Sequence, residues 1–396
     1  MFVRIKWLIA IAATVQSTCA CAQYLPAFDP NQQRFEQAVK LMATDVDQAI
    51  SIFRSVYQDT KAVRVQLELA RSLFLAGRLA DAKVEFISVL AKPIPIAVRD
   101  RVEWYLSEIQ KRGTAKIYVG FFQDSNPGQI TAARTFDVLG QPLSYQPNVS
   151  TRPEIGLNIS AEVERELVNK SGFFLQTSAA TFTYPTSAFN RQLADVSLIK
   201  RWQDDNYKDV RVGNELSYYG GNFLYNSPYV STRWVFNRPS QDAWGVWAKA
   251  AVLNYPNYPY LNGSQVQVQF QYLKNFYQNL SGNIEIGVDR TSAAETAYSS
   301  YGASASLGVQ VAEDKYQMQA NIRATVLRRN YWDVDPIWGA VRSDAGQVFS
   351  ITLTKRDFYV FGLRPEVGYI YQMNNSTLPF YSYSKGMIGV FFKNVY

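Results

Sequence analysis

The chain has 396 residues, with 40 basic residues against 33 acidic ones, two cysteines and no histidine. Without histidine, serine–histidine and aspartate–histidine mechanisms lack their general base, and a histidine metal site is excluded. The modest basic excess is spread along the chain, which is not the pattern of a nucleic-acid-binding protein.

The N-terminal segment has the pattern of a secretory signal peptide. Two basic residues, Arg4 and Lys6, precede an apolar stretch over residues 7–15, and a run of small residues supplies a cleavage site. We expect residues 1–22 to be removed as a signal peptide and residues 23–30 to form a linker. The apolar stretch is too short to remain as a membrane-spanning helix.

Both cysteines, Cys19 and Cys21, lie within this predicted signal. Cleavage after Ala22 would leave a mature protein without cysteine, which excludes disulfides and thiol chemistry and suits an oxidising export route. Attachment of a lipid to Cys19 or Cys21 is the alternative, but neither is preceded by the Leu or Val that begins a lipidation signal.

Residues 31–113 show helical periodicity, with apolar residues at intervals of three and four. One apolar set is repeated 33 residues further along the chain: Ala49, Phe53 and Val56 return as Ala82, Phe86 and Val89. That period is typical of tetratricopeptide repeats, with a generic helical hairpin domain as the alternative. We predict a short α-solenoid that ends with a helix over residues 96–110 and binds protein on its concave face.

From residue 114 to the C-terminus, apolar and polar residues alternate in runs of strand length. The clearest run interleaves four glutamines with apolar residues: Gln265, Gln267, Gln269 and Gln271 alternate with Val266, Val268, Phe270 and Tyr272. Runs of ~9–11 residues with a polar face of Gln, Asn and Ser are typical of a membrane barrel with a hydrated lumen. The predicted fold class is therefore multidomain, α + all-β: a tetratricopeptide-like α-solenoid, then over residues 114–396 a transmembrane antiparallel β-barrel of about 14 strands.

Connections between the predicted strands are of two kinds. Short polar turns, such as residues 169–172 and 204–206, are typical of the periplasmic end of a barrel. The longer connections are predicted to be outer loops: residues 127–153, 185–192, 220–227, 256–262, 291–299 and 330–344.

The last strand has apolar residues at alternate positions and ends on an aromatic residue: Ile388, Val390, Phe392 and Tyr396. This pattern resembles the C-terminal signal by which bacterial outer-membrane barrels are recognised for assembly. We therefore predict that these four residues bind the barrel-assembly machinery. The expected location is the bacterial outer membrane, with its lipid as a further partner and the N-terminal domain in the periplasm.

Two sets of carboxylates are candidates for chemistry. Asp333 and Asp335 lie in a loop and suit a calcium ion, but further ligands at the needed spacing are lacking, which favours a solvated loop. The second candidate is a pair of glycosidase carboxylic acids among the carboxylates on polar strand faces: Glu162, Glu164, Glu285 and Asp289. The simpler interpretation is that these carboxylates line the lumen as ordinary charges. We predict no enzyme activity, no metal and no cofactor.

Several motifs resemble those of the surface lipoprotein assembly modifiers (Slam), which combine short tetratricopeptide-like repeats with a barrel of roughly fourteen strands. The likeness is strongest where the barrel begins and where it ends. The matching segments are Trp104-Tyr105-Leu106, the stretch Tyr118–Asn126 with its Asp-x-Asn ending, Leu353–Asp357, Gly362–Pro365, Tyr369–Ser376 and Tyr381–Lys385. Departures are Asn375-Ser376-Thr377, where the family usually has Ser-Asn, and Pro379 in the following segment.

The resemblance implies export of protein cargo, either a surface lipoprotein or a related secreted protein, with the repeats engaging cargo or a periplasmic chaperone. An exopolysaccharide or small-solute export porin is the alternative, and a passive structural barrel is a third. An inward cluster of arginine and tyrosine would favour the polysaccharide exporter. Five strand residues are the candidates for such a cluster: Arg201, Arg211, Arg233, Arg323 and Arg328.

Overall fold

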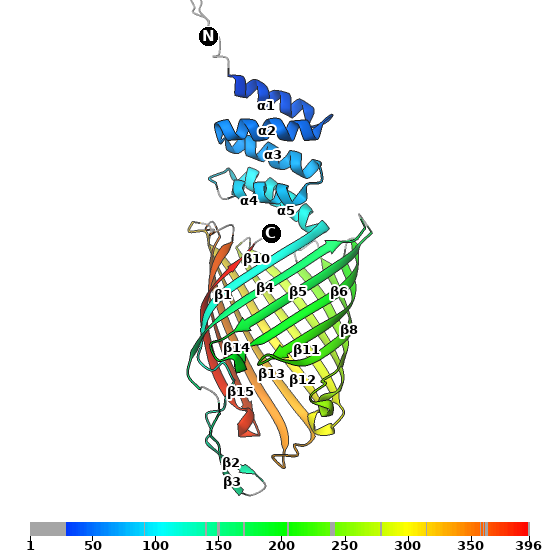
Figure 1. The fold of residues 1–396 in the computed structure, drawn as a ribbon, viewed down its shortest axis with the longest axis vertical. Helices are drawn as coiled ribbons and strands as arrows, with labels where there is room; N and C mark the ends of the chain where they lie inside the picture. Colours follow the sequence, from blue (N-terminus) through cyan, green and yellow to red (C-terminus); the bar gives the residue numbers. More distant parts are fainter. Residues whose placement is uncertain are drawn as a thin grey trace, which may run out of the picture. The chain divides into compact units, whose positions relative to one another are not determined.

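The computed structural model describes most of the chain from residue 29 onward (Figure 1). The described residues are 29–90, 92–138, 141–148, 151–168, 171–203, 206–237, 242–277, 279–313, 315–356, 358, 360 and 363–394. The predicted signal peptide and its cleavage site lie outside them, as does Tyr396. The chain divides into two compact units, one ending at Ala76 and the other beginning at Gly77.

The first unit is a three-helix layer formed by α1 (Pro30–Leu41), α2 (Val46–Thr60) and α3 (Val63–Leu75). Aspartates begin two of these helices, because the Asp29 carboxylate accepts from the backbone N–H of Asn31 and the Asp45 carboxylate from that of Gln48. Phe35 and Phe53 meet edge to face in the core, with ring centroids 5.6 Å apart.

The second unit begins with α4 (Leu79–Leu90) and α5 (Ile96–Arg112). Phe86 of α4 is fully buried and stacks on Tyr105 of α5 at a centroid distance of 5.0 Å. The two apolar sets that repeat in the sequence are all buried: Ala49, Phe53 and Val56 in α2, and Ala82, Phe86 and Val89 in α4. The predicted helical region is therefore confirmed, and its assignment to tetratricopeptide repeats stays a prediction.

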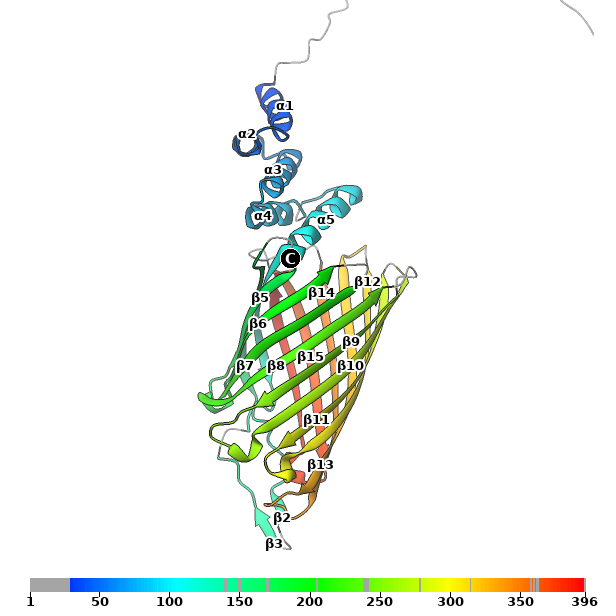
Figure 2. The same ribbon diagram turned by 90° about the vertical axis from the view of Figure 1, so that its right-hand side faces the viewer.

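Within the described residues, fourteen antiparallel strands close a barrel in which β1 pairs with β16 and the others pair in chain order (Figures 1 and 2). This confirms the predicted fold class and strand number. The barrel strands are β1 (Gly113–Asp124), β4 (Glu154–Glu166), β5 (Phe173–Thr183), β6 (Arg191–Gln203), β7 (Tyr207–Tyr219), β8 (Asn222–Asn237), β9 (Asp242–Leu253), β10 (Gly263–Tyr277), β11 (Leu280–Ala293), β12 (Ser300–Glu313), β13 (Met318–Val334), β14 (Val341–Lys355), β15 (Arg364–Ser376) and β16 (Tyr383–Lys393).

The two faces of the strands follow the alternation in the sequence. In β10, Val266, Val268 and Phe270 are exposed on the outer face of the barrel, whereas Gln265 and Gln267 are half-buried on the inner face. A polar wall therefore surrounds the lumen. No helix among the described residues has the length and apolar character needed to cross a membrane.

The connections differ between the two ends of the barrel. We call the end that bears the longer connections the loop end, and the end at which α5 leads into β1 the turn end. The longest connection, between β1 and β4, carries a small hairpin of β2 (Thr135–Val138) and β3 (Gln141–Ser144). Long connections outside and short turns in the periplasm are the usual arrangement of outer-membrane barrels.

Two of the predicted outer loops are shorter than expected. The segment 220–227 contains only a two-residue turn, because Gly220 and Gly221 both take positive φ angles, of 58° and 82°, and β8 then begins at Asn222. The segment 330–344 is mostly strand, since β13 extends to Val334 and β14 begins at Val341.

Candidate functional site

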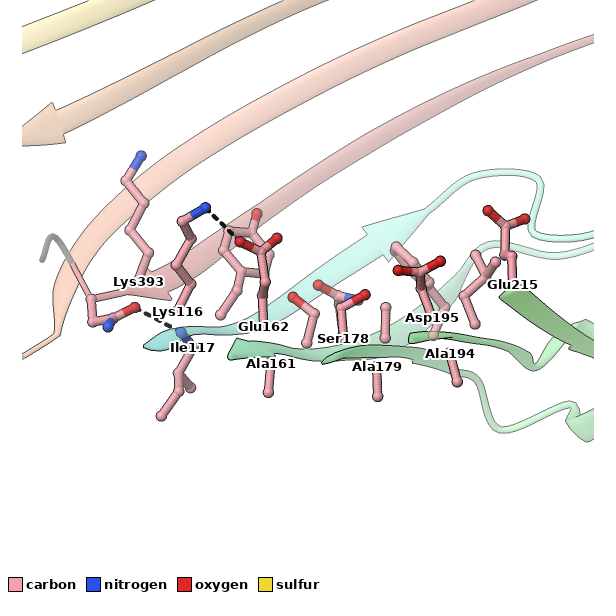
Figure 3. Close-up of a pocket in the computed structure, with 17 residues that line it drawn as sticks. Lys116, Ile117, Ala161, Glu162, Ser178, Ala179, Ala194, Asp195, Glu215 and Lys393 are labelled. Atoms are coloured by element: carbon pink, nitrogen blue, oxygen red, sulfur yellow. Dashed lines mark hydrogen bonds and ion pairs between the residues drawn. The ribbon is translucent and has the colours of Figure 1, made fainter. Parts of the chain in front are cut away.

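The inner wall of the barrel contains a cavity of about 590 Å³ beside β1 and β4 to β7. Figure 3 shows Glu162, Asp195 and Glu215 pointing into this cavity, whereas the neighbouring Ala161 and Ala194 point to the other side of the sheet. Charged side chains therefore gather on the lumen side because the strand alternation puts every second residue there.

Charges on the inner wall are largely paired. Arg201 donates two hydrogen bonds to Glu164, at 3.0 and 2.8 Å, and Lys116 donates to Glu162 at 2.7 Å. Two more pairs link strands β11 and β13: Arg323 with Glu285 at 2.9 Å, and Arg329 with Asp289 at 2.8 Å. Each carboxylate considered as a glycosidase acid thus faces a cation, which is the arrangement of ion pairs lining a lumen.

Three of the five candidate arginines share one region of the inner wall. Arg201 and Arg233 both lie beside Asp209 in the strand register, and Arg211 lies two residues further along β7. Tyr207 joins them, donating to Asp209 at 2.5 Å and accepting from Arg201 at 3.1 Å. The carboxylates of Glu164 and Asp209 are interspersed, so this cluster is of mixed charge. The other two candidates lie elsewhere: Arg323 pairs with Glu285, and Arg328 is on the outer face of β13.

The two aspartates that suited calcium have structural partners, and Asp333 lies within β13 and not in a loop. Asp335 accepts from the backbone N–H groups of Ile337 and Trp338 at 2.9 and 3.2 Å, which caps the turn between β13 and β14. Asp333 accepts from the hydroxyl of Thr296 at 2.8 Å. Over the described part of the chain, His, Cys, Asp and Glu form no group of three or more able to hold a metal ion.

A buried ion pair joins β1 to β16 at the loop end. The fully buried carboxylate of Asp124 accepts from Lys385 at 2.8 Å and from the Tyr184 hydroxyl at 2.9 Å. Two residues on, the Asn126 side chain donates to the carbonyls of Ile130 and Ser384, at 2.9 and 3.1 Å. The Asp-x-Asn ending of the β1 motif thus ties the first strand to the last and fixes the start of the long loop.

An aromatic cluster lies inside the barrel below this ion pair. Phe122 and Phe391, from the first and last strands, are buried together with Tyr184 and Phe189 of the β5–β6 connection, and Ile130 of the long loop packs against them. This arrangement was not predicted from the sequence. The Asp-x-Asn motif was the sequence feature that could have indicated it, because Asp and Asn side chains at a strand end typically form hydrogen bonds with nearby backbone groups.

The described residues of the candidate assembly signal lie on the outer face of the barrel. Ile388 and Val390 are 54% and 41% exposed there, and Phe392 is half-buried on the same face. Ile388 pairs with Gln123 and Val390 with Phe121 of β1. Its fourth residue, Tyr396, lies outside the described residues. The role of these four residues stays a prediction.

Residues 116–396, the barrel almost in full, match the family model described as surface lipoprotein assembly modifier. The chain belongs to this family. It is 22% identical to Surface lipoprotein assembly modifier 1 of Haemophilus influenzae, over 95% of this chain and 80% of that protein. Membership makes it an outer-membrane β-barrel that exports surface lipoproteins, and not an enzyme.

Two solved outer-membrane proteins are similar to this chain at a low level. An outer membrane channel from Pseudomonas putida F1 is 11% identical with a TM-score of 0.36, covering 71% of this chain and 95% of the channel. The Pseudomonas putida toluene transporter TodX is 8% identical with a TM-score of 0.38, covering 71% of this chain and 89% of the transporter.

Proposed function

We propose that this family member exports lipoproteins, or related secreted proteins, by passing them through the lumen of its barrel as extended chains. The observation that carries the proposal is the family match over residues 116–396, which spans the polar-lined lumen. The loop end then faces the cell exterior and the turn end the periplasm.

The lining of the lumen suits an unfolded polypeptide. The glutamine row of β10 offers hydrogen bonds that exchange readily with hydrogen bonds to water. Each such bond to a passing chain therefore stabilises the contact by only about 1 kcal/mol. Ion pairs such as Arg323–Glu285 neutralise charges that would otherwise hold a passing acidic or basic residue. A chain therefore meets many weak contacts and few strong ones.

The parts of the chain have separate proposed roles. Residues 1–22 direct export and are removed, residues 23–30 form a linker, and residues 31–113 engage cargo or a periplasmic chaperone. The terminal signal of Ile388, Val390, Phe392 and Tyr396 is recognised by the barrel-assembly machinery. Its three described members face outward, where a membrane-embedded partner can reach them.

Protease shaving of intact cells tests the export function. Candidate lipoproteins and secreted proteins encoded nearby are co-expressed with and without this barrel. We expect at least one to become protease-sensitive only when the barrel is present, and this exposure to be lost when residues 31–113 are deleted. Cargo exposure that does not depend on the barrel would contradict the proposal.

Export of a polysaccharide is the second candidate, favoured by the region of Arg201, Arg211 and Arg233 with Tyr207 near the turn end. Conductance of the barrel in a planar bilayer tests this second candidate. An open pore that soluble acidic glycans block would support polysaccharide export in addition to lipoprotein export.

A further inference from the structure

The outer face of β11, β12 and β13 changes character at one level along the strands. Counting from the turn end, each strand has five successive apolar positions on its outer face, which on β12 follow the exposed Glu313, and then a polar position. That polar residue is Arg290 on β11, Tyr301 on β12 and Arg328 on β13. The apolar positions include exposed Ile286, Val288, Leu307 and Val326.

The length of this apolar stretch matches a membrane. Five alternate positions span roughly 27 Å of strand at ~3.4 Å per residue, and a tilt of ~40° reduces this to roughly 21 Å of height. The apolar band of outer-membrane barrels is ~25 Å tall. Arg290, Tyr301 and Arg328 therefore lie where the hydrocarbon of the outer leaflet gives way to its headgroups.

The two arginines lie close enough to act on one ligand. Across β12, Arg290 lies opposite Tyr301, and Arg328 lies opposite Ala303, two residues further along that strand. The two arginines are therefore two strands apart sideways and two residues apart along the strand direction. That places their backbones roughly 12 Å apart, within the combined reach of two arginine side chains. Arg290 also leans across β12, with its guanidinium 4.5 Å from the ring centroid of the outward-facing Trp332.

Among the described residues, neither Arg290 nor Arg328 has a carboxylate partner, in contrast to the paired arginines of the lumen. A pair of unneutralised guanidinium groups beside hydrocarbon is costly unless an anion from outside the chain is present.

The pair is also confined to one place. On the described barrel strands, Arg290 and Arg328 are the only basic residues that the alternation puts outward in the half nearer the loop end. The other outward basic residues lie near the turn end: Arg165, Lys200, Lys208, Lys274 and Lys355. This one-sided placement indicates a specific ligand of the outer leaflet rather than a general basic girdle.

We propose that Arg290, Arg328, Tyr301 and Trp332 form a binding site for a phosphate group of lipid A, the lipid anchor of the outer leaflet. Guanidinium groups bind phosphate through paired hydrogen bonds, and Tyr and Trp are the aromatic residues preferred at a membrane interface. The exposed Val288 and Val326 below the arginines lie where the acyl chains of such a lipid would pack. The site does not depend on which cargo the lumen carries.

Binding of lipid A to the purified full-length protein in detergent tests this proposal. Bisphosphorylated lipid A and chemically dephosphorylated lipid A are each titrated against the wild type and against Arg290→Gln, Arg328→Gln and the double variant. Arg165→Gln is the matched control, because it removes an exposed outward arginine at the opposite end of the barrel. Heat-modifiable migration on gels verifies that each variant is folded.

We expect the wild type to prefer bisphosphorylated lipid A, each single variant to bind it roughly fivefold more weakly, and the double variant about twentyfold more weakly. The Arg165→Gln control should bind like the wild type. If the wild type binds phosphorylated and dephosphorylated lipid A equally well, that result alone overturns the proposal, whatever the variants do. A folded double variant that retains wild-type affinity would also overturn it.

Discussion

Replacing Asp124 with asparagine removes one charge from the buried pair that joins the first and last strands. Asp124 is 0% exposed and Lys385 is 9% exposed, so the lysine left behind has almost no access to water. Removing one partner of a buried ion pair costs about 3 kcal/mol or more, because the remaining charge is then buried alone. We therefore expect Asp124→Asn to destabilise the barrel by about 3 kcal/mol.

Urea unfolding of the purified protein in detergent, followed by gel mobility, measures this loss. Lys116→Gln is the matched control, since it breaks a pair whose lysine is 63% exposed, and such pairs contribute ~0–1 kcal/mol. Combining Asp124→Asn with Lys385→Gln should recover much of the loss, because no isolated charge then remains. The reasoning is refuted if Asp124→Asn costs no more than Lys116→Gln, or if the double variant is less stable than Asp124→Asn alone.

Three further predictions concern other parts of the chain. Gly120→Val should reduce the yield of folded barrel, because a Cβ at Gly120 would lie 2.1 Å from the ring of Phe391; wild-type heat-modifiable protein would argue against this. Phe86→Ala should destabilise the helical region by ~3–5 kcal/mol in thermal unfolding followed by circular dichroism, whereas Val84→Ala, at an exposed position, should change it little. Deleting Tyr396 should lower outer-membrane levels in fractionated cells, and an unchanged level of folded barrel would remove it from the assembly signal.

Local periodicity explains why much of the fold could be predicted. The alternation of Gln265 and Gln267 with Val266 and Val268 specifies which face of β10 meets the lumen, and this follows from two-residue strand geometry alone. In the same way, the spacing of Ala82 and Phe86 specifies the buried face of a helix. Both patterns are carried by neighbouring residues, so a single sequence contains them.

Pairings between distant residues could not be predicted. Asp124 and Lys385 are 261 residues apart and meet only because the barrel closes with a particular register between β1 and β16. Arg328 points outward and Arg329 inward because successive residues of β13 alternate between the two faces of the sheet. The two side chains are chemically identical, so their chemistry does not indicate which of them faces the lumen. The tight turn at Gly220 was missed because the residues after it alternate weakly.

Site-specific photo-crosslinking tests most directly whether cargo passes through the lumen. A photoreactive amino acid is placed at Ser178, which points into the cavity, and in a matched variant at Ala179, which points to the other side of the same strand (Figure 3). With a co-expressed lipoprotein cargo held in transit by a fused folded domain, export through the lumen predicts crosslinks from position 178 and none from position 179. Crosslinks from position 179 alone, or from neither position while the cargo still reaches the surface, would contradict passage through the barrel.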